Sequence, residues 1–101
     1  MDGSGLTYGN GSIAFTTVAK DTLTFELRAG DVDVLLKGTF RGKEQSIWEP
    51  AEVRELGVVP AGTSQCFTID ISSLQSIALI PGKASAHSSF AECWITNIYL
   101  Y

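Results

Sequence analysis

Apolar and polar residues alternate with a period of two along several short stretches of this chain. In residues 22–28, Leu23, Phe25 and Leu27 alternate with threonine and charged residues. A period of two places successive side chains on opposite faces of a β-strand, whereas an amphipathic helix needs apolar residues three or four positions apart. The stretch therefore predicts a strand with one buried face.

Further strands are expected where alternation, or β-branched and aromatic residues, recur: 13–18, 32–40, 67–71, 76–80 and 90–101. Turn residues separate these stretches at intervals of roughly 8 to 12 residues, and no stretch predicts a helix of ten residues. The pattern predicts an all-β fold, an antiparallel β-sandwich of jelly-roll type with six to eight short strands. We expect 22–28 and 32–40 to pair as a hairpin, and Pro81-Gly82 to end the strand before it.

The length of 101 residues, with 45% apolar residues, fits one domain with its own core. Residues 1–12 contain four glycines and are expected to form a flexible arm, followed by a single β-sandwich domain over residues 13–101. The alternation predicts a set of inward-facing residues: Leu23, Phe25, Leu27, Val34, Phe67, Ile69, Ile77 and Leu79.

The net charge of −4 disfavours nucleic acid as a partner, since such binding needs a basic surface. No apolar run approaches the roughly 20 residues of a membrane span, so membrane insertion is not expected. The acidic, glycine-rich N-terminus is unlike a signal peptide, and the sequence assigns no location.

The segment from Glu44 to Gly57 is open to three interpretations. Pro50 excludes a central strand, and Pro50 with Gly57 fits the two ends of a short helix. However, only Val53 and Leu56 supply an apolar stripe. A non-helical structure, either an edge strand or a long loop, is therefore the favoured interpretation over a helix.

The two cysteines, Cys66 and Cys93, are too few for a disulfide scaffold. Both are expected to be reduced, packed as small apolar residues and slow to react. A Cys66–Cys93 bridge remains an alternative if their strands are neighbours, because bridged Cα atoms must lie within about 7 Å.

The last segment, 90–101, carries apolar residues on both predicted faces. Trp94 is assigned to the core. Such a strand must be covered by another segment or meet another chain, and we expect a homo-oligomer with Tyr99 or Tyr101, and also Trp48, at the contact. Trp48 has two interpretations: it caps one end of the sandwich, or it offers a flat face to a sugar ring or a protein.

The sequence gives little support for catalytic activity or for metal binding. His87, the single histidine, lies in a Ser/Ala-rich segment without a nucleophile motif and is expected to be an exposed loop residue. Asp31 and Asp33 are too few carboxylates for a calcium loop and fit a turn. Acidic residues at 49, 52 and 55 fit a solvated face. We expect no enzyme activity, no metal site and no cofactor.

The stretch from Phe67 to Ile80 resembles part of the galactose-binding-like jelly rolls: a strand ending in an aspartate, Asp70, a turn of small residues, a leucine, Leu74, and a short apolar strand. That superfamily includes carbohydrate-binding modules and accessory or receptor-binding proteins of tailed phages. The resemblance implies a non-catalytic structural or binding module, such as a small phage virion accessory protein that docks into a larger assembly. A carbohydrate-binding module is the alternative. Aromatics beside hydrogen-bonding groups in a groove would favour a sugar, and a flat aromatic patch would favour a protein partner.

Overall fold

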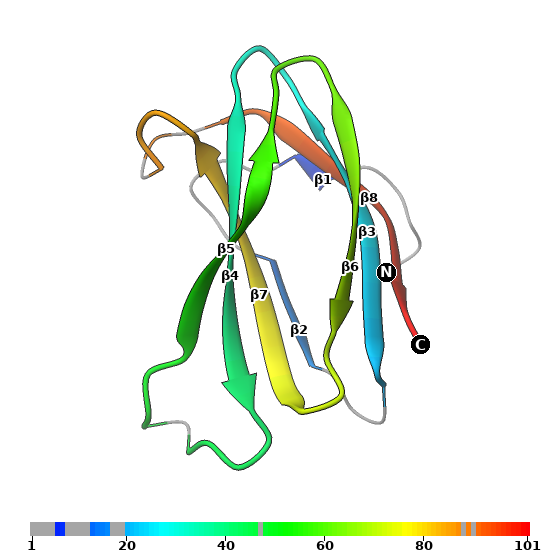
Figure 1. Ribbon diagram of the computed structural model, residues 1–101, viewed down its shortest axis with the longest axis vertical. Helices are drawn as coiled ribbons and strands as arrows, with labels where there is room; N and C mark the ends of the chain where they lie inside the picture. The colour runs from blue at the N-terminus through cyan, green and yellow to red at the C-terminus, as the bar shows by residue number, and fades with distance from the viewer. Residues whose placement is uncertain (1–5, 8–12, 17–19, 47, 88, 90) are drawn as a thin grey trace.

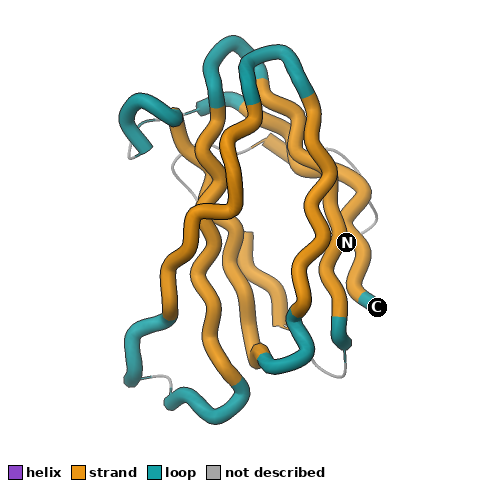
Figure 2. Tube along the Cα trace, in the orientation of Figure 1, coloured by secondary structure: helices purple, strands orange, loops and turns teal. Residues whose placement is uncertain are grey.

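The computed structural model describes residues 6–7, 13–16, 20–46, 48–87, 89 and 91–101, and within 6–7 and 13–16 it describes the backbone alone. These residues form eight strands and no helix (Figures 1 and 2). The strands are β1 (Leu6–Thr7), β2 (Ile13–Thr16), β3 (Thr22–Ala29), β4 (Val34–Gly42), β5 (Glu52–Val59), β6 (Ser64–Asp70), β7 (Leu74–Lys83) and β8 (Cys93–Leu100).

The strands form two antiparallel four-stranded sheets that pack face to face. Sheet A has the order β1-β8-β3-β6, and sheet B has the order β2-β7-β4-β5. This order is that of an eight-stranded jelly roll, in which the chain crosses repeatedly from one sheet to the other. The prediction of an all-β sandwich of jelly-roll type is confirmed.

The prediction that residues 22–28 and 32–40 pair as a hairpin is wrong. β3 belongs to sheet A and pairs with β6 and β8, whereas β4 belongs to sheet B and pairs with β5 and β7. Both strands carry a regular alternation, so each buries one face. They bury those faces against each other across the core instead of lying side by side in one sheet.

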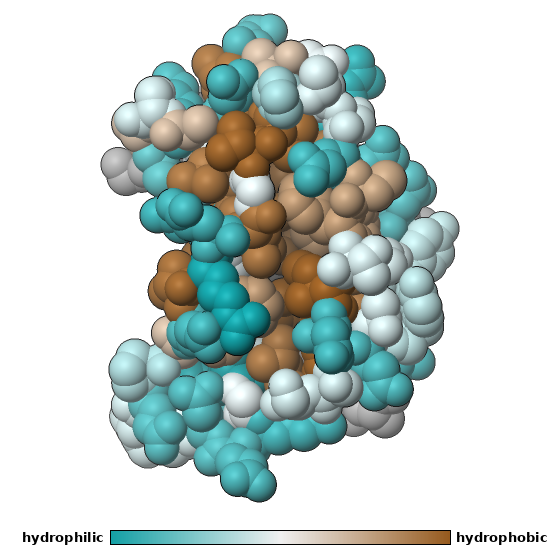
Figure 3. All heavy atoms as spheres, in the orientation of Figure 1, coloured by the Kyte–Doolittle hydropathy of each residue, from teal (hydrophilic) through white to brown (hydrophobic). Residues whose placement is uncertain are grey.

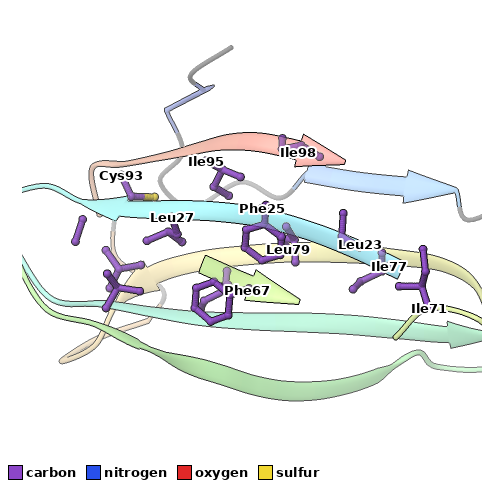
Figure 4. Packing of buried hydrophobic residues seen from close by; sticks show 14 of the residues in the cluster. Leu23, Phe25, Leu27, Phe67, Ile71, Ile77, Leu79, Cys93, Ile95 and Ile98 are labelled. Atoms are coloured by element: carbon purple, nitrogen blue, oxygen red, sulfur yellow. The ribbon is translucent and has the colours of Figure 1, made fainter. Parts of the chain in front are cut away.

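The core lies between the sheets (Figure 4). Seven of the eight residues predicted to face inward are buried, and Ile69 is half-buried and packs against the others. The rings of Phe25 and Phe67 stack with centroids 5.2 Å apart. Leu23 and Leu27 of β3 and Leu79 of β7 are fully buried, and all three lie on the inner faces of their sheets.

A β-bulge in β8 corrects the interpretation of the final segment. Thr24 opposes Tyr99 while Glu26 opposes Thr96, so β8 has one extra residue at this point. Asn97 takes a positive φ of 53°, a conformation that asparagine tolerates better than most residues. The extra residue reverses the alternation, and all four inward positions of β8 lie on one face: Cys93, Ile95, Ile98 and Leu100. The segment is therefore not apolar on both faces, and Trp94 points outward, not into the core.

Sheet B contains one further departure from expectation and one confirmation. β7 continues through Pro81 to Lys83, with Pro81 opposite Leu36 of β4. The register of β2 on the other side of β7 ends at Leu79, so the missing N–H of Pro81 costs no ladder bond to β2. The non-helical interpretation of residues 44–57 is confirmed, since a loop leads into the edge strand β5.

The two cysteines are not joined by a disulfide. Cys93 is buried as expected, but Cys66 is exposed, which corrects the prediction that both pack in the core. Cys66 lies on β6 and Cys93 on β8, and β3 separates the two strands. Two strand spacings of about 4.8 Å exceed the reach of a disulfide.

The N-terminal arm lies largely outside the described residues. Within it, Leu6 and Thr7 form β1, which pairs with Ile95 and Trp94 of β8.

Candidate functional site

The outer face of sheet A carries three rows of side chains from β8, β3 and β6. Because directly opposed residues share a face, the register fixes each row. The rows are Trp94–Arg28–Ser64, Thr96–Glu26–Cys66 and Tyr99–Thr24–Thr68. An aromatic side chain thus stands at each end of β8, with hydroxyl, carboxylate and guanidinium groups between and beside the two rings. We call this surface the sheet A face.

The bulge in β8 places a polar amide in the middle of the sheet A face. Asn97 is exposed, and its Nδ2 donates a hydrogen bond of 3.2 Å to Oε1 of Glu26. The bond fixes the carboxylate of Glu26 between the two aromatic positions. The amide oxygen of Asn97 and the second oxygen of Glu26 make no hydrogen bond to another described residue, so each can accept one from a ligand.

One hollow of the sheet A face, with a volume of about 360 Å³, lies beside Trp94. Its lining combines the half-buried indole with Glu26, Arg28, Ser64 and Thr96. Cζ of Arg28 lies 6.0 Å from the centroid of the Trp94 ring, at the outer limit of a cation–π contact. The volume falls within the range of small-ligand sites, and the lining offers one apolar wall with several polar groups.

A second, smaller hollow of about 190 Å³ adjoins the first, and Glu26 lines both. Tyr99, which is 58% exposed, forms one side, and Thr24, Thr68 and Asn97 are among the polar groups of the lining. The two hollows lie next to each other on the sheet A face, with Trp94 in the lining of the first and Tyr99 in the lining of the second, and we refer to the two together as the groove.

The three residues predicted to bind a partner do not come together. Tyr99 lies on the sheet A face, and Tyr101 follows β8, where its backbone bonds with Asp21 and Thr22 hold the chain end against β3. Trp48 lies in the loop that joins β4 to β5 of sheet B (Figure 1). It does not cap the sandwich, because 88% of its surface is exposed.

Hydrogen bonds from Arg41 hold the loop that carries Trp48 in place. Nη1 of Arg41 donates hydrogen bonds to the carbonyl oxygens of Ser46, at 2.6 Å, and Glu49, at 2.7 Å. These bonds hold the chain on both sides of Trp48. The ring is therefore presented to solvent by an anchored loop.

His87 is not the exposed loop residue that was expected. It is half-buried, and its Nε2 lies 2.9 Å from the carbonyl oxygen of Ile80 in β7, so the ring holds the segment after β7 against that strand. Asp33 has a similar role, since its Oδ1 accepts a hydrogen bond from the backbone N–H of Ala61. His87 thus connects a loop to a strand, whereas Asp33 connects the β3–β4 loop to the β5–β6 loop.

No group of three or more histidine, cysteine or acidic side chains gathers into a metal-binding cluster among the described residues. The acidic residue Glu52 is instead paired with Arg54, through bonds of 2.7 and 3.0 Å. These hydrogen bonds lower the pKa of Glu52 and raise that of Arg54.

Sequence reasoning missed Trp94, Glu26, Arg28 and Asn97 as members of a candidate site. The alternation in β3 indicates that the strand has a polar face, but the sequence does not indicate which residues of other strands lie beside that face. The signal for Trp94 was a change of parity: apolar residues occupy odd positions at 93 and 95 and even positions at 98 and 100, with Asn97 at the change. A bulge at an asparagine explains that change.

No helix in the described part of the chain is long and apolar enough to cross a membrane. Searches with protein-family models and against curated proteins find no match to this chain.

Proposed function

We propose that this protein is a non-catalytic carbohydrate-binding module whose ligand lies along the sheet A face. The observation that carries the proposal is the groove between Trp94 and Tyr99, which has Glu26 and Asn97 at its centre. Sugar rings combine apolar faces with many hydroxyl groups. Such a ligand needs flat aromatic surfaces next to fixed donors and acceptors, and this groove offers both.

The chemistry of the groove supports binding rather than turnover. Among the residues that the structure describes, Glu26 is the one carboxylate that lines either hollow. Glycoside hydrolysis by the usual route uses two carboxyl groups on opposite sides of the bond that is cleaved.

A structural role in a larger protein assembly, such as a small phage virion accessory protein, is the second candidate. The observation in its favour is Trp48, an 88% exposed aromatic residue on an anchored loop, because aromatic residues are enriched at the centres of protein interfaces. Jelly rolls occur among both capsid and lectin domains, so the fold does not discriminate between the two functions.

The decisive experiment screens the full chain against an array of neutral and acidic oligosaccharides and then titrates the best ligand by calorimetry. We expect Trp94→Ala to weaken binding by about 1–3 kcal/mol, roughly five- to more than a hundredfold, because the aromatic wall of the larger hollow is lost.

Trp48→Ala is the matched control, since it removes an equally large ring outside the groove and should leave binding unchanged. Thermal melts of both variants check that each remains folded. A chain that binds no oligosaccharide on the array, or that loses binding with Trp48→Ala but not with Trp94→Ala, would contradict the proposal and favour the protein assembly.

A further inference from the structure

The two sheets each end in an edge strand on the same open side of the sandwich, β5 in sheet B and β6 in sheet A (Figure 1). An edge strand exposes unpaired backbone N–H and C=O groups and can pair with another chain. Proteins commonly block such edges with bulges or inward-pointing charges.

β5 is blocked in both ways. Leu36 opposes Gly57 and Lys37 opposes Glu55, so a bulge interrupts the strand at Leu56. Beyond the bulge, Arg54 places its guanidinium carbon 4.6 Å from the centroid of the buried Phe40 ring, and it is held there by Glu52. A charged pair thus covers the core at this edge, and strand addition to β5 is disfavoured.

β6 has none of these features. Its seven residues pair with β3 in one continuous register, without a bulge. The strand contains no proline, glycine, lysine or arginine, and its one charge is Asp70 at the C-terminal end. In the described part of the chain, no strand pairs with its outer edge.

The surface next to β6 is apolar. Ile69 is half-buried at the edge of the core, and the ring of Phe67 stacks on Phe25 at the same edge. Figure 3 shows apolar side chains reaching the surface between β5 and β6, with hydrophilic residues over part of β5. A regular strand edge beside exposed apolar surface is suited to strand addition.

We propose that β6 pairs with β6 of a second copy of this chain, in antiparallel orientation about a two-fold axis at Phe67. The two copies of sheet A then form one continuous sheet of eight strands. This register puts Ser64 opposite the partner's Asp70 and Cys66 opposite the partner's Thr68. Phe67 lies opposite the partner's Phe67, which extends the ring stack through the interface.

Charge complementarity favours a second copy of this chain over a different protein as the partner of the β6 edge. Arg28 of β3 lies beside Ser64 on the outer face of the sheet and forms no ion pair within the described residues. The Arg28 guanidinium now lies 6.0 Å from the Trp94 ring on β8. In the proposed register the long side chain turns from Trp94 toward β6 and reaches past the small Ser64 to the partner's Asp70. The two-fold axis repeats this contact, so the same surface patch of each copy contacts that of the other, as a symmetric dimer requires.

The first test is the mass of the intact protein in solution, measured by light scattering after size exclusion over a wide range of concentrations. We expect a dimer that dissociates on dilution. Thr68→Lys should raise the dissociation constant about tenfold or more, because an edge lysine opposes strand pairing. The matched control, Val53→Lys, adds the same charge to the exposed face of β5 and should leave the dimer unchanged.

The second test fixes the register. Under mild oxidation, Thr68→Cys should form a covalent dimer rapidly, because Cys66 would lie opposite the partner's new cysteine at a distance that suits a disulfide. The unmodified chain should cross-link far more slowly, since its two Cys66 thiols would be diagonal neighbours.

A monomeric mass at every concentration, or a dimer that Val53→Lys disrupts and Thr68→Lys does not, would overturn the proposal. Equal cross-linking of the Thr68→Cys variant and the unmodified chain would overturn the register. These outcomes do not depend on the carbohydrate proposal, because neither test uses a sugar and Trp94 is unchanged throughout.

Discussion

Gly82 shows how one residue couples a loop to the sandwich. A Cβ atom built at this position would overlap the backbone carbonyl oxygen of His87 and lie 2.9 Å from its ring. The same histidine bonds to Ile80, so the loop cannot move away without losing that contact. Gly82→Ala should therefore destabilise the protein by about 1–3 kcal/mol or more, measured by denaturant unfolding.

Gly42→Ala is the matched control for this prediction. Its Cβ would lie 3.5 Å from the side chain of Gln45, an ordinary contact, so a change within about 0.5 kcal/mol is expected. If the two variants lost the same stability, the close approach at Gly82 would not be the cause.

The turn from β6 to β7 depends on hydrogen bonds to one carboxylate. Oδ1 of Asp70 accepts bonds from the Ser72 hydroxyl, at 2.7 Å, and from the Ser72 backbone N–H, at 2.9 Å. These bonds lower the pKa of Asp70, the hydroxyl contributing most. A carboxyl group whose pKa is lowered on folding adds stability above its unfolded pKa of about 3.9, and this stability is lost as the pH falls through the folded value.

Ser72→Ala should weaken this dependence. Its unfolding free energy should fall less than that of the unmodified chain as the pH drops from about 5 to 2. The control Ser73→Ala alters a neighbouring exposed serine and leaves the Asp70 contacts in place, so it should follow the unmodified chain. Identical acid titrations for Ser72→Ala and the unmodified chain would show that the turn carries no such linkage.

The strands could be predicted from sequence, but their partners could not. Alternation in β3 and β4 identifies the buried face of each strand, because burial of one face is a local property of the pattern. Which sheet a strand joins depends on contacts far apart along the chain, and both a hairpin and a sandwich satisfy the same alternation.

The candidate site was less predictable than the core for the same reason. Trp94 was assigned inward because an unbroken strand was assumed, and one bulge at Asn97 moved it to the outer face. Trp48 and Tyr99 were recognised as aromatic residues available for binding, but the sequence contains no sign that one lies on sheet A and the other at the end of sheet B. Two of the polar neighbours of Tyr99, Thr24 and Thr68, come from β3 and β6, which are remote from it in sequence.

At the scale of the whole molecule, one core supports both sheets, and Phe25 is one of its buried residues. Its side chain is 2% exposed and stacks on Phe67, so it links β3 to the edge strand β6 as well as to sheet B across the core. Phe25→Ala should cost about 3–5 kcal/mol. That is a large part of the roughly 5–15 kcal/mol typical of a domain, so the variant should unfold at a much lower denaturant concentration.

The measurement should separate folding from association. Dimer formation stabilises the folded state by mass action, so the comparison is best made in the Thr68→Lys background at low protein concentration. Phe25→Leu keeps most of the buried volume and should cost less than about 1.5 kcal/mol. A loss below about 1 kcal/mol for Phe25→Ala would mean that the ring does not hold the sheets together, and the inward assignment of β3 would be wrong.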